Sequence, residues 1–182
     1  TGAGDKAFCA GNDAKEFSEE FLKRPRNFWK FLGLLHEALD LFRHLGKPTI
    51  ARINGVVAGG GNDWNLAADL AIAADHARFV QAGTRVGLVD AAGSTQWLPL
   101  LIGDRRAREM LLTGDEISAE QALHWGLVNE LVRYEQLDRA VETLVRKLVH
   151  QLPECTRYTK QQLNFWKDLA WSLTAGHARD WL

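Results

Sequence analysis

The sequence has few cysteines, few prolines and no excess of charge of either sign. Its 182 residues include two cysteines, Cys9 and Cys155, and four prolines. Two cysteines so far apart in the chain do not form the disulfide framework of a small secreted domain. A single disulfide between them is the alternative. We therefore expect free thiols, a reducing compartment and a cytoplasmic location.

The charges nearly cancel, because 22 Lys and Arg residues stand against 23 Asp and Glu residues. Without a basic excess the chain has no general attraction for nucleic acid or an anionic membrane, so neither partner is expected. No apolar run approaches the roughly 20 residues that span a bilayer, and no signal-peptide pattern is visible. The six histidines are scattered without metal-ligand spacing, so no metal site is predicted.

The residues that are present indicate one well-filled core, since 46% of them are hydrophobic. Strand-like and helical stretches alternate up to about residue 133, and helical patterns alone follow over 134–182. This order predicts the α/β class, with a layered core over 1–133 and a helical C-terminal region over 134–182.

Several elements have clear sequence signals. Apolar residues recur at helical spacing over 16–45, and Pro25 is expected to begin the longer helix of that span. The stretch "TIARINGVVA" is typical of a buried strand with a turn or bulge at Asn54 and Gly55, and "LAIAADHARFVQAG" predicts a short strand pair. In "STQWLPLLIGDRRAREMLLTG", Pro99 and Gly103 are expected to break a helix.

The second half of the chain has helix-capping signals. Ser118 and Gln121 have the spacing of a capping box, and Gly126 is placed to end the helix that they begin. The long helical stretch after residue 137 is expected to break near Pro153.

Three consecutive glycines, Gly59, Gly60 and Gly61, separate a predicted strand from a predicted helix. Amide groups at such a helix start have no intrahelical partner, and the missing side chains let a ligand oxygen approach them. The pattern therefore predicts either a phosphate cradle or an oxyanion hole. Tight packing of strand against helix is the alternative use of these glycines.

A phosphate loop would continue with Lys and then Ser or Thr, and a dinucleotide-binding fold would read GxGxxG. Asn62, Asp63 and Trp64 stand there instead, and the Asp63 carboxylate would repel a phosphate. An oxyanion that forms only in a transition state, beside a carboxylate that moves a proton, agrees better with these residues.

Three stretches, in this order, resemble the signature blocks of the crotonase (enoyl-CoA hydratase/isomerase) superfamily: "GDKAFCAGNDAKEF", "KPTIARINGVVAGGGNDWNLAADLAIAADHARF" and "LLTGDEISAEQALHWGLVNELV". The resemblance covers residues 1 to about 165. It implies a crotonase-like fold of repeated ββα units with a helical C-terminal trimerisation region, and N-terminal repeats that precede residue 1. It also implies an acyl-CoA substrate and a homotrimer or dimer of trimers.

The same resemblance implies that the main-chain amides of Asn12 and Gly60 form the oxyanion hole. Hydratases of the family carry two glutamates, and at the matching positions this chain has Asp63 and Gly83. Gly83 cannot transfer a proton, which places a plain hydratase mechanism in doubt.

The stretch "QAGTRVGLVDAAGS" is similar to dihydroxynaphthoyl-CoA synthases and 2-ketocyclohexanecarboxyl-CoA hydrolases, in which Gly matches Gly83 and a catalytic Asp matches Asp90. The resemblance is broadest to 6-oxocyclohex-1-ene-1-carbonyl-CoA hydrolases, although these lack a carboxylate at the position of Asp90. It implies catalysis by Asp90 and Asp63 and hydrolytic cleavage of a cyclic keto acyl-CoA. No cofactor is expected, and bicarbonate or a similar anion is an option in place of the missing glutamate.

Substrate contacts are expected from a further set of residues, namely Ala10, Asp13, Trp64, Gly83 and Ser94. Each has a plainer alternative: a solvated loop charge for Asp13, core packing for Trp64, and a helix N-cap for Ser94. The alternative for Asp63 is a purely structural role, in which its negative charge interacts favourably with the helix dipole. The alternative for Asp90 is a residue that only stabilises a turn.

Two other functions compete with the ring-cleaving hydrolase. One is an enoyl-CoA hydratase or isomerase. The other is a non-catalytic protein that has kept the CoA-binding fold.

Overall fold

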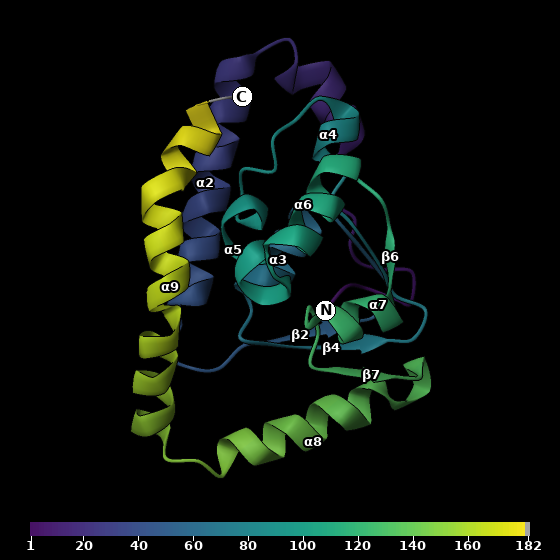
Figure 1. Ribbon diagram of the computed structural model, residues 1–182, viewed down its shortest axis with the longest axis vertical. Helices are drawn as coiled ribbons and strands as arrows, with labels where there is room; N and C mark the ends of the chain where they lie inside the picture. The colour runs from purple at the N-terminus through teal and green to yellow at the C-terminus, as the bar shows by residue number, and fades with distance from the viewer. Residues whose placement is uncertain (181–182) are drawn as a thin grey trace.

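The computed structural model describes residues 1–180 and shows two small β-sheets surrounded by helices (Figure 1). One sheet has the strand order β1-β3-β5-β6, and the other has the order β2-β4-β7. Neighbouring strands are parallel except β5 and β6, which are antiparallel. The strands are β1 (Ala7–Cys9), β2 (Ile50–Ile53), β3 (Val56–Ala58), β4 (Leu70–Ala74), β5 (Arg78–Val80), β6 (Ile117–Ser118) and β7 (Glu130–Val132).

The chain passes from one sheet to the other at two tight turns, which join β2 to β3 and β4 to β5. "TIARINGVVA" is therefore two strands in different sheets, a correction to the single strand expected. The turn depends on Asn54, whose side-chain amide donates to the carbonyls of Gly4 (2.7 Å) and Ala7 (3.2 Å). A side chain at Gly55 would collide with the Lys6 carbonyl.

Buried side chains from both sheets and from the helices form the main core. They include the fully buried Ile53, Val57, Leu66, Phe79 and Trp97. Burying each of these large side chains contributes on the order of 2 kcal/mol. This core fixes the ends of β3 and β5, from which the two loops of the candidate site emerge.

The helices largely follow their sequence signals. Helix α2 begins at Pro25, Gly114 ends α6, and the Ser118–Gln121 capping box and the left-handed Gly126 bound α7. Pro99 lies inside α5 without breaking it, which corrects the expected break. A proline within a helix removes one main-chain hydrogen bond, and this nine-residue helix continues in spite of that loss. The helices up to the last strand are α1 (Ala14–Glu16), the π-helix η1 (Phe17–Phe21), α2 (Pro25–Arg43), α3 (Gly60–Ala67), α4 (Gly83–Val86), α5 (Ser94–Ile102), α6 (Asp104–Thr113) and α7 (Ala119–Trp125).

Helical structure alone follows β7, over η2 (Tyr134–Gln136), α8 (Leu137–Val149) and α9 (Pro153–Asp180). The expected break at Pro153 is confirmed. Helix α8 packs under the β2-β4-β7 sheet through Leu137, whereas α9 lies beside α2 (Figure 1). Residues 181 and 182 of the predicted C-terminal region lie outside the described residues.

Helix α9 is fixed to the core by buried polar contacts. Lys160 donates to the Asp69 carboxylate (2.8 Å), and Asn164 donates to the carbonyl of Arg43 (3.0 Å). Lys167 donates to the Leu66 carbonyl (2.6 Å) at the end of α3. Within residues 1–180, no helix combines the length and hydropathy needed to cross a membrane.

Candidate active site

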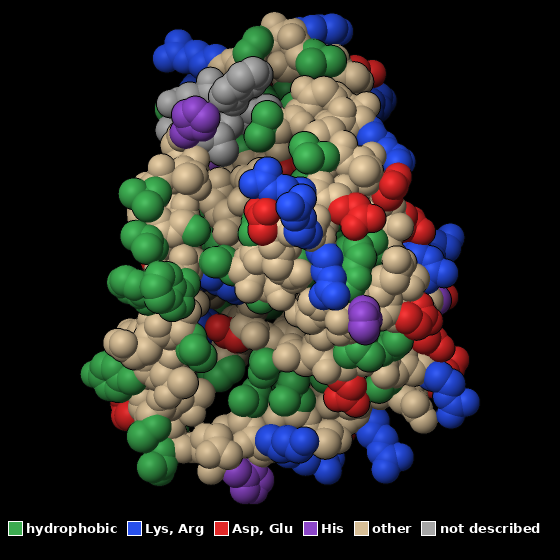
Figure 2. Space-filling view, in the orientation of Figure 1, with side chains coloured by type: hydrophobic (Ala, Val, Ile, Leu, Met, Phe, Trp, Pro, Cys, Tyr) green, Lys and Arg blue, Asp and Glu red, His purple; other side chains and the backbone are tan. Residues whose placement is uncertain are grey.

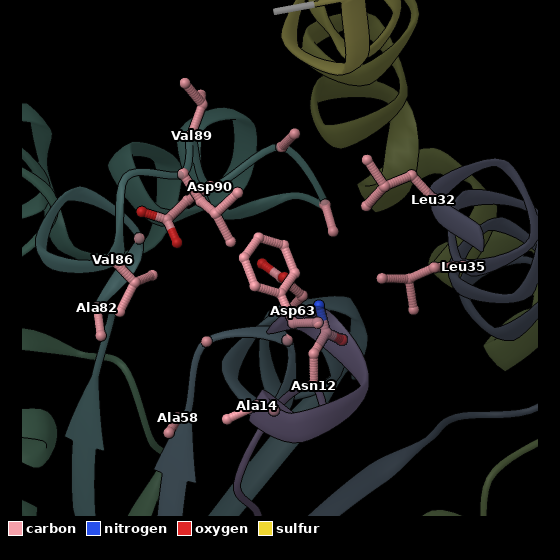
Figure 3. A pocket seen from close by; sticks show the side chains of 18 of the residues that line it. Asn12, Ala14, Leu32, Leu35, Ala58, Asp63, Ala82, Val86, Val89 and Asp90 are labelled. Atoms are coloured by element: carbon pink, nitrogen blue, oxygen red, sulfur yellow. The ribbon is translucent and has the colours of Figure 1, made fainter. Parts of the chain in front are cut away.

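A pocket of about 270 Å³ opens where the loops after β1, β3 and β5 meet helix α2 (Figure 3). Its walls are mainly apolar. The apolar side chains come from η1, α2 and the loop after β5, namely Phe17, Phe28, Leu32, Leu35, Val86, Leu88 and Val89. The polar groups are few and lie together, as is usual in ligand-binding pockets.

The three glycines between β3 and α3 have different roles. Gly59 has φ 49°, in the region that favours glycine, and precedes the first residue of α3. A Cβ at Gly61 would lie 2.1 Å from the Cys9 carbonyl oxygen, so the approach of α3 to β1 requires glycine there. Gly60 meets neither constraint, because its Cβ would have only the Asn12 Oδ1 within 4 Å, at 3.7 Å. Backbone conformation thus explains Gly59 and close packing explains Gly61, but neither explains Gly60.

Asn12 and Gly60 lie next to each other on the pocket wall. Gly60 is the first residue of α3, so its N–H has no partner within the helix. Over the described part of the chain, neither the Asn12 nor the Gly60 amide has a recorded hydrogen-bond acceptor. Two main-chain amides without acceptors in one pocket, one of them at a helix N-terminus, are suited to stabilise negative charge on an oxygen.

Asp63 lies in the first turn of α3 and is 4% exposed. Its Oδ1 accepts a hydrogen bond from the Ser94 hydroxyl at 2.5 Å. Burial raises the pKa of Asp63 to about 7, the Ser94 hydrogen bond opposes this rise, and the nearby Asp90 charge adds to it. The Asp63 carboxyl group therefore keeps its proton to a higher pH than an exposed aspartate does.

Asp90 reaches the same pocket from the loop between α4 and α5. A Cβ at Gly83 would lie 2.7 Å from both Asp90 carboxylate oxygens, so the carboxylate occupies the space of a side chain there. Burial raises the pKa of Asp90 to about 6, against a hydrogen bond from the Gly83 main chain. The loop itself is held by Thr95, which donates to the Asp90 carbonyl (3.1 Å).

The structure brings most of the predicted site residues together. Those that line the one pocket are Ala10, Asn12, Gly60, Asp63, Gly83 and Asp90. Ser94 lies directly behind Asp63 and is fully buried. Its predicted N-cap alternative is wrong, because Gly93 is the N-cap of α5 and the Ser94 hydroxyl bonds Asp63 instead.

Two further predicted substrate contacts, Trp64 and Asp13, like Ser94 do not line the pocket, which corrects the sequence expectation. Trp64 follows Asp63 by one residue and so points about 100° away around α3, where its ring packs edge-on against Phe42. Asp13 turns to the main chain and caps α1, accepting from the amides of Lys15 (2.8 Å) and Glu16 (3.0 Å).

Sequence reasoning missed two contributors to the site. The apolar face of α2 was assigned to the core, but Phe28, Leu32 and Leu35 of this face line the pocket. Gln81, immediately after β5, is fully buried and donates from Nε2 to the Ser94 Oγ. A buried polar residue at the end of a strand was the available signal. Among the described residues no cluster of His, Cys, Asp and Glu could hold a metal ion.

Comparison with known proteins agrees with this geometry. The family model described as enoyl-CoA hydratase/isomerase matches residues 1–175. A short-chain-enoyl-CoA hydratase of Clostridium acetobutylicum is 35% identical over 90% of this chain and 62% of its own length. A 6-oxocyclohex-1-ene-1-carbonyl-CoA hydrolase of Geobacter metallireducens is 28% identical over 100% of this chain and 61% of its own. The chain thus spans about three fifths of the length of these curated relatives.

Solved structures show the same similarity. The crystal structure of an enoyl-CoA hydratase from Bacillus anthracis superimposes with a TM-score of 0.85 at 33% identity, over 94% of this chain and 70% of that one. A structure of Pseudomonas aeruginosa DspI superimposes with a TM-score of 0.84 at 33% identity, over 99% of this chain and 68% of that one. The expected fold class is confirmed, and the chain belongs to the crotonase (enoyl-CoA hydratase/isomerase) superfamily.

Proposed function

We propose that this pocket binds an acyl-CoA thioester and stabilises negative charge on the thioester oxygen with the amides of Asn12 and Gly60. The observation that carries the proposal is the placement of two unpartnered amides, the buried Asp63 carboxyl group and the half-buried Asp90 carboxylate in one apolar pocket. The loss of one such donor typically costs a hundredfold or more in rate. The apolar walls suit an uncharged acyl group.

The two carboxylates have separate tasks in this proposal. With its pKa raised to about 6, Asp90 is ionised near neutral pH and acts as the general base. With its pKa raised to about 7, Asp63 keeps a proton over much of the same range and acts as the general acid. Two carboxyl groups whose environments separate their pKa values are a common way to assign such roles.

The reaction that we favour is hydrolytic cleavage of a ring that carries a ketone β to the thioester. Asp90 takes a proton from water, whose oxygen adds to the ketone carbon. The bond between this carbon and the α-carbon then breaks, and its electron pair forms the thioester enolate at Asn12 and Gly60. Asp63 protonates the α-carbon, which leaves a carboxylic acid and an open-chain acyl-CoA.

A bound anion is not part of this scheme. Bicarbonate in the position of the missing glutamate stays an untested option, and it would lie close to the Asp90 carboxylate, which fills the space of a Cβ at Gly83. A second negative charge there would also raise the cost of ionising Asp90. No step is therefore assigned to bicarbonate.

The proposal is tested by incubating the chain with a 2-ketocyclohexanecarboxyl-CoA thioester and following the product by mass spectrometry. Ring opening adds the mass of water and creates a new carboxyl group. Coupling the product to an amine detects this carboxyl group as a further increase in mass. Asp90→Asn is expected to lower this turnover at least a hundredfold. Unchanged turnover in Asp90→Asn would contradict the role of Asp90, and binding of thioesters without any turnover would favour a non-catalytic binder.

A second candidate is hydration of an enoyl-CoA, which the similarity to the Clostridium acetobutylicum hydratase favours. The same base and acid could add water across a carbon–carbon double bond. Incubation with crotonyl-CoA distinguishes the two reactions, because hydration adds water without a new carboxyl group.

We also propose that the chain assembles as a trimer or a dimer of trimers. Large apolar side chains lie exposed along α9, among them Leu163 (71% exposed), Trp166 (64%) and Leu173 (72%) (Figure 2). An exposed apolar stripe of this kind commonly marks a protein interface. Light scattering at several concentrations tests the assembly, and a monomer at all of them would contradict it.

A further inference from the structure

Asp63 is the end of a hydrogen-bond chain that continues away from the pocket into the core. The Ser94 hydroxyl donates to Asp63 Oδ1 (2.5 Å), and Gln81 Nε2 donates to Ser94 Oγ. Ser94 and Gln81 are both fully buried, and they come from the start of α5 and the end of β5. Neither residue is among those that line the pocket.

The chain has a fixed direction. A serine hydroxyl has one proton to donate, and its oxygen here accepts from the Gln81 amide. The hydroxyl proton is therefore directed to Asp63 Oδ1, which acts as an acceptor. While the Ser94 hydroxyl donates to Oδ1, a proton on Asp63 is accommodated on Oδ2 without reversing the chain.

We propose that Ser94 and Gln81 are positioning residues that occupy Oδ1 of Asp63 as an acceptor and so keep its transferable proton on Oδ2. The inference rests on the proposed function for its catalytic meaning, but the hydrogen-bond chain can be tested without turnover. Figure 3 shows the Asp63 side chain pointing into the pocket, the direction in which Oδ2 would deliver its proton.

The surroundings of Asp63 leave few other groups that could direct this proton. Asp90 is the charged group that acts on it, and the main-chain N–H of Ser94 adds a further donor to the carboxylate. Helix α2 faces the pocket with apolar side chains, and its His36 bonds the Ala91 carbonyl (3.0 Å). From β1, the Cys9 main chain lies against Gly61.

The experiment is a titration of the chain carrying ¹³C-labelled aspartate carboxyl groups, followed by NMR. The Asp63 signal is assigned by its loss in Asp63→Asn. In Ser94→Ala we expect the midpoint of Asp63 to rise by about one pH unit, because one hydrogen bond to the ionised form is lost. Ser94→Thr retains a hydroxyl and is expected to restore the wild-type midpoint. Ser172→Ala removes an exposed serine on α9 and is the matched control.

Gln81→Met keeps the side-chain length and removes the amide, so it tests the chain without altering Ser94. We expect a rise of the Asp63 midpoint that is smaller than in Ser94→Ala. Since the role is positional, kcat on a thioester should fall about tenfold in Ser94→Ala, with KM nearly unchanged.

The outcomes separate the two proposals. If the Asp63 midpoint is the same in wild type, Ser94→Ala and Gln81→Met, the positioning role is overturned, even where thioesters are turned over. If the midpoint moves as expected and Ser94→Thr restores it, the chain is supported, even where no thioester reacts and the proposed function fails. Should Ser94→Ala not fold, Gln81→Met alone decides between these results.

Discussion

The carboxylate of Asp90 takes the space that a side chain at Gly83 would fill, with both its oxygens 2.7 Å from a Cβ built on Gly83. The two residues are seven positions apart: Gly83 is the first residue of the one-turn helix α4, and Asp90 lies in the loop that follows it. A carboxylate is thus supplied by Asp90 at a place where Gly83 has no side chain. The Asp90 carboxylate can therefore take up this position only because residue 83 has no side chain.

Gly83→Ala should therefore reduce activity without unfolding the chain. The methyl group would displace the Asp90 carboxylate, the movable end of a side chain, and we expect kcat to fall at least tenfold with a small change in Tm. Gly176→Ala on α9, where a Cβ meets no atom within 4 Å, is the control and should retain full activity. Steady-state kinetics on a thioester checks both, and a fully active Gly83→Ala would refute the coupling.

Gly60→Pro tests the amide at the start of α3. Proline is tolerated at the first position of a helix, and it replaces the N–H that we assign to the oxyanion hole with a ring carbon. We expect kcat to fall by about a hundredfold or more. Gly60→Ala keeps the N–H, and its Cβ has ordinary space beside Asn12, so it should lose far less. Equal kinetics for the two variants would remove the Gly60 amide from the mechanism.

The pH dependence of kcat/KM should follow the two carboxyl groups. Because Asp90 must be ionised and Asp63 protonated, activity should rise through about pH 6 and fall through about pH 7. In Asp90→Asn the residual activity should lose the acidic limb. The pKa of Asp63 should also drop, since the Asp90 charge no longer raises it. A profile flat from pH 5 to 8 in the wild type would disagree with this assignment.

Asp63 should reduce the stability of the chain as the pH rises. Burial raises its pKa from 3.8 to about 7, so between these values the folded chain holds a proton that the unfolded chain has lost. The free energy of unfolding should then decrease from about pH 4 to about pH 7, by on the order of 4 kcal/mol from this group alone.

Asp63→Asn removes the titration and retains an oxygen that can accept from Ser94. Its stability relative to wild type should increase over this pH range, as measured by urea unfolding. A stability difference that does not change with pH would show that Asp63 titrates normally.

Local signals predicted much of the fold. Pro25, the Ser118 capping box and Gly126 act within a few residues of their own position, and the structure places helix ends at each of them. The separation of "TIARINGVVA" into two sheets was not predictable in the same way. It depends on which distant strands pair with β2 and β3, and on contacts of Asn54 with the first residues of the chain.

The sequence predicted the parts of the site that the main chain forms. It did not predict the parts that depend on how side chains from distant elements pack together. The glycine triplet indicated free amides, and Asp63 and Asp90 lie beside them. Helical periodicity identified an apolar face on α2 but could not tell a core from a pocket wall, because both require the same residues. Trp64 and Ser94 were assigned by residue type. The contact of Trp64 with Phe42 depends on how α3 is rotated, and the contact of Ser94 depends on Gln81, 13 residues away in the sequence.

The most direct test of the central claim is a crystal structure of the chain with a non-reactive acyl-CoA thioester analogue bound. We expect the thioester oxygen about 3 Å from the amides of both Asn12 and Gly60, with Asp63 and Asp90 on either side of the acyl group. An acyl group bound outside this pocket, or a thioester oxygen that meets neither amide, would contradict the proposed function.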